Sequence, residues 1–131
     1  MEVALRALLL SYAPLTALVS QRIVWNEIPQ GSADPNVSLF NVDPGASYTY
    51  AGPSRLRGAL VQINIRALTF ASAVAVRDAI EARLSGFKGV QGGIEFGGIF
   101  LRSVRSQTEK PSTTLYHTIQ TDWDVWWRPA A

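Results

Sequence analysis

The residues best suited to chemistry are His117, Asp122 and Asp124, which lie within one short segment. A Ser-His-Asp site would have to use His117, the chain's one histidine, but the residues that alternate with it are apolar. A lone histidine in such a strand is more often a packed structural residue than a general base. We therefore predict no catalytic residue.

Asp122 and Asp124 are two positions apart, so in a strand their carboxylates share one face at about 6–7 Å. Paired carboxylates can bind a metal ion or share a proton. No third carboxylate accompanies them nearby in the sequence, so a solvated acidic edge is the better interpretation. Pairing with arginines of a neighbouring strand or subunit is equally open. We predict no metal site and no cofactor.

Composition argues against several classes of function. The 131 residues include no cysteine, which excludes disulfides, thiolate catalysis and iron–sulfur clusters. The formal charge is +2 and the 12 basic residues are dispersed, which disfavours DNA binding as the main role. No apolar run approaches the ~20 residues that span a membrane, and the apolar N-terminal block, interrupted by Arg6, predicts an amphipathic helix. The glycine-rich residues 87–98 lack the phosphate-binding spacing G-x-x-x-x-G-K-S/T.

Two other features favour a protein–protein interface. Residues 44–58 carry two prolines, three glycines, two tyrosines and two arginines, so they form either a plain hairpin connection or a functional loop. Trp123 and Trp127 share one face of the last strand and Trp126 takes the other. A tryptophan on each face implies that both faces are covered, one of them by another subunit. The candidate assembly residues are Tyr48, Tyr50, Arg55, Arg57, Asp122, Asp124 and Trp126.

The elements that position these residues are organised around residues 58–89. Alternation of apolar and polar residues over 61–66 predicts a half-buried strand. The period then becomes helical, with Thr69 placed as an N-cap and Gly86 as a helix stop. The apolar stripe of this helix comprises Ala73, Val76, Ile80 and Leu84.

The remaining segments complete the fold. A helix is predicted over residues 2–11, interrupted by Pro14, and strands over 37–42, 99–107 and 113–128, the last two as an antiparallel hairpin. We expect one domain over residues 1–131, with a long loop or hairpin arm at about 44–58. The fold class is α+β, with an antiparallel or mixed sheet of about four main strands and two helices packed on one face.

Several short motifs follow one another over nearly the whole chain. They are LRALLL at 5–10, LTALV at 15–19, an R-I-aromatic segment at 22–25, I-P-Q-G at 28–31, G-P-S at 52–54, V-Q-I at 61–63, V-R-D-A-I at 76–80, and Tyr116, Asp122, Trp123 and Trp126 in the last strand. In order and spacing these motifs resemble the tail-completion or tail-terminator proteins of long-tailed bacteriophages and phage-like gene transfer agents.

The resemblance implies a structural protein of the virion tail, made in the host cytoplasm, with no catalytic residues to carry over. Such proteins form a hexameric ring at the head-proximal end of the tail tube, stop its growth and provide the docking surface for the head connector. The implied partners are further copies of the chain, the tail tube protein and a connector or stopper protein, with no membrane. DNA would cross the lumen without specific binding, and Gln62, Asn64 and Arg66 would face that lumen or a neighbouring subunit.

Two alternatives stay open. Another neck component, such as a head-completion or stopper protein, would differ in its position in the particle. A small ligand-binding or enzymatic domain would show a concave pocket with convergent polar groups near His117, or near Asp122 and Asp124.

Overall fold

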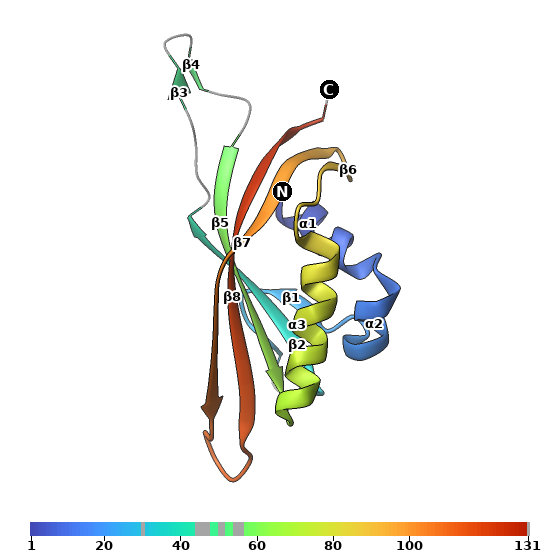
Figure 1. Ribbon diagram of the computed structural model, residues 1–131, viewed down its shortest axis with the longest axis vertical. Helices are drawn as coiled ribbons and strands as arrows, with labels where there is room; N and C mark the ends of the chain where they lie inside the picture. The colour runs from blue at the N-terminus through green and yellow to red at the C-terminus, as the bar shows by residue number, and fades with distance from the viewer. Residues whose placement is uncertain (30, 44–47, 50–51, 54–56, 131) are drawn as a thin grey trace.

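The computed structural model describes residues 1–29, 31–43, 48–49, 52–53 and 57–130 (Figure 1). Its helices are α1 (Glu2–Leu10), α2 (Ala13–Val19) and α3 (Phe70–Leu84). Its strands are β1 (Ile23–Trp25), β2 (Asn36–Asp43), β3 (Tyr48–Thr49), β4 (Gly52–Pro53), β5 (Arg57–Ala67), β6 (Gly89–Gln91), β7 (Ile94–Glu109) and β8 (Tyr116–Pro129).

The main sheet is mixed and curled, and its strands lie in the order β1-β2-β5-β8-β7-β6. β1 is parallel to β2, and the other neighbours in this sheet are antiparallel. The helices cover one face (Figure 1), so the α+β class is confirmed. In detail the described chain differs from the prediction, with six strands in this sheet instead of about four and three helices instead of two. The short strands β1 and β6 have three residues each, too few to show a period of their own.

The central strand and helix follow the predicted periods. Along β5, alternate residues from Ala59 to Ala67 are buried. α3 begins after Thr69, whose hydroxyl accepts a hydrogen bond from the Ser72 amide at 3.1 Å, and this satisfies one of the free amides of the first turn. The chain leaves the helix through Gly86 at φ +73°, a conformation that glycine adopts without strain. The predicted stripe of Ala73, Val76, Ile80 and Leu84 is buried.

The two N-terminal helices pack on the same side as α3. Pro14 lies in the first turn of α2, where its missing amide hydrogen leaves no bond unmade, so it separates two helices. Arg83 of α3 donates to the Leu8 carbonyl at 3.1 Å and to the Ser11 hydroxyl at 2.8 Å, which ties α3 to the end of α1. Among the described helices none alone is long and apolar enough to cross a membrane. Only α1 and α2 taken together reach that length and hydropathy, and the two helices are bent by 89° relative to each other.

The buried side of the sheet is built around Trp123, which is fully buried. Its Nε1 donates to Thr121 Oγ1 at 2.9 Å, and that hydroxyl donates to the Ile63 carbonyl at 3.0 Å. These two hydrogen bonds give partners to polar atoms that would otherwise be buried without any. Trp127 differs, because its buried Nε1 has no hydrogen-bond partner in the described part of the chain.

The sheet extends beyond its helical cover at both ends. Residues 100–109 of β7 are all exposed, so the far end of the β7–β8 hairpin, called here the ribbon, forms an uncovered edge of the sheet, with β8 paired to β5 on its inner side. Figure 1 shows this ribbon at the lower end of the molecule and the β3–β4 pair at the upper end.

Candidate assembly surface

The face of the sheet turned away from the helices, called here the open face, is mainly polar. Side chains alternate between the two faces along each strand, so the strand registers assign them. The open face comprises Asn36, Ser38 and Phe40 of β2, Leu60, Gln62, Asn64 and Arg66 of β5, Phe100, Ser103, Arg105 and Gln107 of β7, and Thr118, Gln120, Asp122, Asp124 and Trp126 of β8. Its centre is therefore a field of amides and hydroxyls.

The two aspartates of the open face lie beside arginines of the neighbouring strand β7. Arg105 Nη2 is 3.9 Å from Asp122 Oδ2, and the Ser103 hydroxyl donates to the same oxygen at 2.7 Å. Arg102 Nη1 is 3.9 Å from Asp124 Oδ1. These loose, exposed pairs contribute little stability, but they balance charge across the face. The described residues contain no group of three acidic, histidine or cysteine side chains that could hold a metal ion.

An aromatic corner, formed by Trp126 and Phe100, occupies the upper end of the open face. Trp126 lies in register between Gly58 of β5 and Gly98 of β7. A Cβ atom at Gly58 would meet the Trp126 ring at 2.8 Å, and one at Gly98 would meet the Phe100 ring at 2.7 Å. The glycines thus let both rings lie close to the backbone. Trp126 remains 40% exposed and Phe100 51% exposed, as expected of residues that complete an interface.

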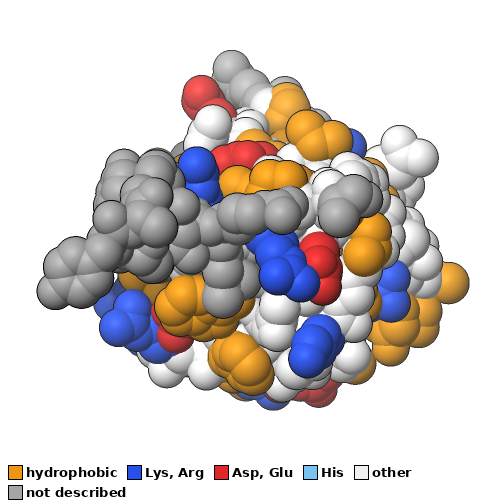
Figure 2. Space-filling view, turned by 90° about the horizontal axis from the view of Figure 1, so that it is seen from above, with side chains coloured by type: hydrophobic (Ala, Val, Ile, Leu, Met, Phe, Trp, Pro, Cys, Tyr) orange, Lys and Arg blue, Asp and Glu red, His pale blue; other side chains and the backbone are white. Residues whose placement is uncertain are grey.

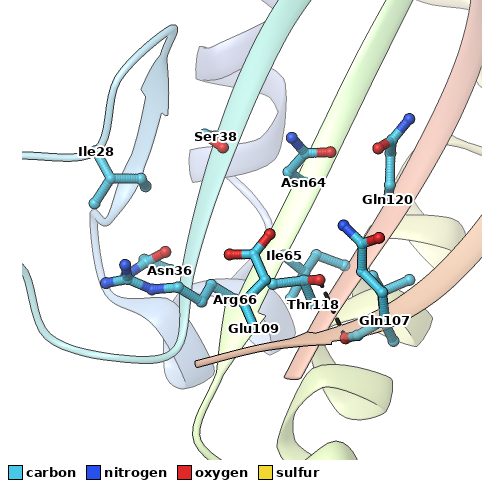
Figure 3. Close-up of a pocket in the computed structure, with 11 residues that line it drawn as sticks. Ile28, Asn36, Ser38, Asn64, Ile65, Arg66, Gln107, Glu109, Thr118 and Gln120 are labelled. Atoms are coloured by element: carbon cyan, nitrogen blue, oxygen red, sulfur yellow. Dashed lines mark hydrogen bonds between the residues drawn. The ribbon is translucent and has the colours of Figure 1, made fainter. Parts of the chain in front are cut away.

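A polar hollow lies on the same face, toward the ribbon (Figure 3). Arg66 is fixed beside it, because its Nε donates to Asp34 Oδ1 at 3.0 Å and its guanidinium lies 4.4 Å from the centre of the Tyr116 ring. Figure 3 shows Gln107 and Glu109 reaching into the hollow from β7. The other lining residues are Ile28, Asn36, Ser38, Asn64, Ile65, Thr118, Ile119 and Gln120. Such a set of amides, hydroxyls and one carboxylate can hydrogen-bond a polar segment of another protein.

The predicted assembly residues are only partly brought together. Asp122, Asp124 and Trp126 share the open face, whereas Arg57 lies on the opposite side, 5.5 Å from the centre of the Trp127 ring. The alternation of β5 could have shown this, since Arg57 has the parity of the buried residues. For Tyr48 only the backbone is described, in β3; Tyr50 and Arg55 lie outside the described residues.

His117 does not join the aspartates. It is half-buried beside Phe70, with the ring centres 6.2 Å apart, and its side chain lies on the face opposite Asp122 and Asp124. Neither His117 nor the aspartates line the polar hollow. A catalytic or ligand-binding domain would require a pocket beside His117, Asp122 or Asp124, and the hollow lies elsewhere.

Sequence reasoning missed Arg105 and Gln107 as members of the open face, and Arg102 as the neighbour of Asp124. The registers shift between Leu101 and Ser103, and such a bulge breaks the alternation from which a face would be read. Figure 2 adds that, seen from the upper end of the molecule, charges of both signs are interspersed with hydrophobic side chains. Neither sign dominates that end.

Comparisons with known proteins were consistent with a structural role. The family described as Tail completion protein gp17 matches residues 3–122. A chain of the "Virion of native gene transfer agent (GTA) particle" has the same fold, with a TM-score of 0.71 and 21% identity over 98% of this chain and 94% of that chain. A second solved protein has a TM-score of 0.57 and 17% identity over 95% of each chain. No curated protein matches the sequence.

The family match confirms three predictions from the sequence. It is the predicted family, and a tail completion protein is a structural protein and not an enzyme. Its place is the virion tail, where it functions together with other tail and head proteins. With 120 consecutive positions matched, from 3 to 122, the chain belongs to the tail completion protein gp17 family.

Proposed function

We propose that this protein is a ring-forming tail terminator, which closes the head-proximal end of the tail tube and provides the surface on which the head connector docks. The observation that carries the proposal is the open face: one side of the sheet is covered by helices, whereas the other is mainly polar and has no helix over it in the described residues. Only its β2 end is buried, at Asn36 and Ser38. In a ring of copies this face would line the channel.

The chemistry of the open face suits a channel for DNA. Its centre carries the amides Gln62, Asn64 and Gln120, and the carboxylates Asp122 and Asp124 lie beside arginines. Phosphates bind where basic groups cluster, because binding there releases counterions. A wall of amides with balanced charges holds DNA weakly, so it would let DNA pass without specific binding.

The two ends of the molecule suit two different partners. The aromatic corner and the β3–β4 pair lie at one end, and the ribbon with the polar hollow lies toward the other (Figure 1). A ring whose subunits meet head-to-tail has two unlike rims, one for the tail tube protein and one for the connector or stopper protein. In this single domain, most of the predicted arm at about 44–58 lies outside the described residues; its described part, the β3–β4 pair, would contact a neighbouring copy. The family resemblance suggests that the ring is a hexamer.

Removing the gene from a particle-producing strain tests the proposal. A tail terminator limits tube growth, so we expect overlong tails that lack heads, and restoration of normal length by the supplied protein. Purified protein should form rings, alone or on isolated tubes, by electron microscopy. Protein that stays monomeric and never cosediments with tubes would overturn the ring. Tails of normal length that fail to join heads would instead favour a head-completion or stopper protein.

A further inference from the structure

We infer that neighbouring copies join edge to edge, with the outer edge of β7 in one copy pairing antiparallel with the end of β2 in the next. The inference rests on the proposed ring and specifies which backbone segments close it. It makes the sheets of successive copies one continuous wall.

Both outer strands are longer than the short strands that cover them. β6 pairs with β7 only over Ile94–Phe96, yet β7 continues to Glu109. β1 pairs with β2 only over Val37–Leu39, yet β2 continues to Asp43. In the described part of the chain no strand pairs with the outer edges beyond these points. Uncovered strand edges offer rows of free amide and carbonyl groups to another strand.

The free segments lie at the same level of the sheet. The registers connect Phe40 through Gln62 and Asp122 to Ser103, and Asp43 through Leu60 and Asp124 to Phe100. A copy placed beside the first without shift along the strands would therefore set residues 40–43 against residues 100–103. Each segment also contains a register shift, between Asn41 and Asp43 and between Leu101 and Ser103, which restricts how the two edges can fit.

The strand directions agree with a rotational ring. β5 runs opposite to β2, β8 opposite to β5, and β7 opposite to β8, so β7 and β2 run in opposite directions. Rotation about an axis along the strands preserves direction. The β7 edge of one copy therefore meets the β2 edge of the next as an antiparallel pair, and the alternation continues across the junction.

Side chains of the two edges are also complementary. Val42 is 53% exposed in the free end of β2, and β7 exposes Phe100, Leu101 and Val104. Exposed apolar residues on an uncovered edge mark a pairing site. β7 adds the exposed Arg102 and Arg105, and Glu2 lies beside the β2 edge, where its Oε1 accepts a hydrogen bond from Asn41 at 2.7 Å. Arg102 and Arg105 lie beside Asp124 and Asp122 of their own copy, so Glu2 of the next copy would join these ion pairs rather than meet free arginines.

Engineered disulfides test the pairing, since the chain has no cysteine of its own. Val42→Cys would be combined with Leu101→Cys in one variant and with Val104→Cys in another, since a disulfide needs Cα atoms about 4.4–6.8 Å apart. The matched control combines Val42→Cys with Leu68→Cys, which is also exposed but lies between β5 and α3, away from both edges. Under mild oxidation of assembled protein, we expect a ladder of covalent oligomers from an edge variant and none from the control.

The outcomes separate this inference from the proposed ring. Rings seen by electron microscopy without a ladder from either edge variant, or with an equal ladder from the control, would refute edge pairing and leave the ring standing. Absence of rings, on tubes as well as alone, would refute both. Val42→Lys provides a second measurement, because lysine blocks edge pairing; it should lower the ring fraction by about tenfold, equivalent to about 1.4 kcal/mol, while Leu68→Lys should not. Equal ring fractions in the two lysine variants would overturn the inference.

Discussion

The ring of Trp126 rests on the backbone of Gly58. A Cβ atom at position 58 would lie 2.8 Å from two atoms of that ring, closer than atoms pack without strain. The two residues face each other across β5 and β8. Gly58 therefore sets where the most prominent aromatic side chain of the open face can lie, and the aromatic corner depends on a residue that has no side chain of its own.

Gly58→Ala should displace the Trp126 ring. Because Trp126 is partly exposed, the ring can swing toward solvent, and we expect a loss of about 1–2 kcal/mol in unfolding free energy with a red-shifted tryptophan emission. Urea unfolding and fluorescence measure both effects. The matched control is Gly58→Ala in a Trp126→Ala background, where the clash is absent. An equal loss in both backgrounds would show that the ring does not rest on Gly58.

Trp126→Ala should separate assembly from folding. The side chain lies on the exposed side of the sheet, so we expect a stability loss of about 1 kcal/mol but impaired ring formation and head joining. Trp123→Ala is the contrast, because it removes a fully buried ring and should cost about 3–5 kcal/mol. Thermal or urea unfolding and electron microscopy of particles provide the readouts. Normal tail length and normal head joining with Trp126→Ala would exclude this residue from the interface.

The periodic parts of the fold could be predicted, because each shows its own signal. The alternation in β5, the stripe of α3, the Thr69 cap and the hairpin of β7 and β8 all depend on residues that are close in sequence. β1 pairs with β2, the next strand along the chain, and β6 pairs with the start of β7 across the turn at Gly92 and Gly93. Their three-residue lengths contain too little pattern, which explains why the sheet has more strands than expected.

The surface was harder to predict than the core. Asp122, Asp124 and Trp126 were grouped correctly on one face because β8 alternates without interruption. Arg57 was predicted as an assembly residue of the segment 44–58, and it lies across the sheet from these three residues, near Trp127. The partners Arg102 and Arg105 were not identified, since the bulge between Leu101 and Ser103 is invisible in the sequence.

Thr121→Val should destabilise the core although it preserves volume. The Thr121 hydroxyl accepts from Trp123 Nε1 and donates to the Ile63 carbonyl, so valine removes both bonds and leaves the buried Trp123 Nε1 without this acceptor. The expected cost is about 1–3 kcal/mol, measured by urea unfolding. Thr118→Val is the control, because its hydroxyl bond to the Gln107 carbonyl is exposed, and it should cost less. Equal costs would show that water satisfies the Trp123 and Ile63 groups.

Glu2 should make the free energy of unfolding depend on pH in the acidic range. The carboxylate accepts hydrogen bonds from its own backbone amide, from Asn41 and from the N-terminal ammonium group, and these lower the pKa of Glu2 although partial burial opposes the shift. A lowered folded-state pKa means that the stabilisation is fully present above the unfolded-state pKa of about 4.3, and that it is lost as pH falls through the lower folded-state value. The stability difference between the natural protein and Glu2→Gln should therefore be constant from pH 7 to about 5 and shrink below about pH 4.

Urea unfolding of both proteins across this range measures the difference directly. Asn41→Ala supplies the control, because it removes one of the hydrogen bonds that lower the pKa of Glu2. In that background the carboxylate keeps its hydrogen bonds to its own backbone amide and to the ammonium group. The stability difference should therefore still decrease at low pH, but by a smaller amount. A difference that stays constant down to pH 3, or that grows as acid is added, would mean that Glu2 is not stabilised as a carboxylate in the folded protein.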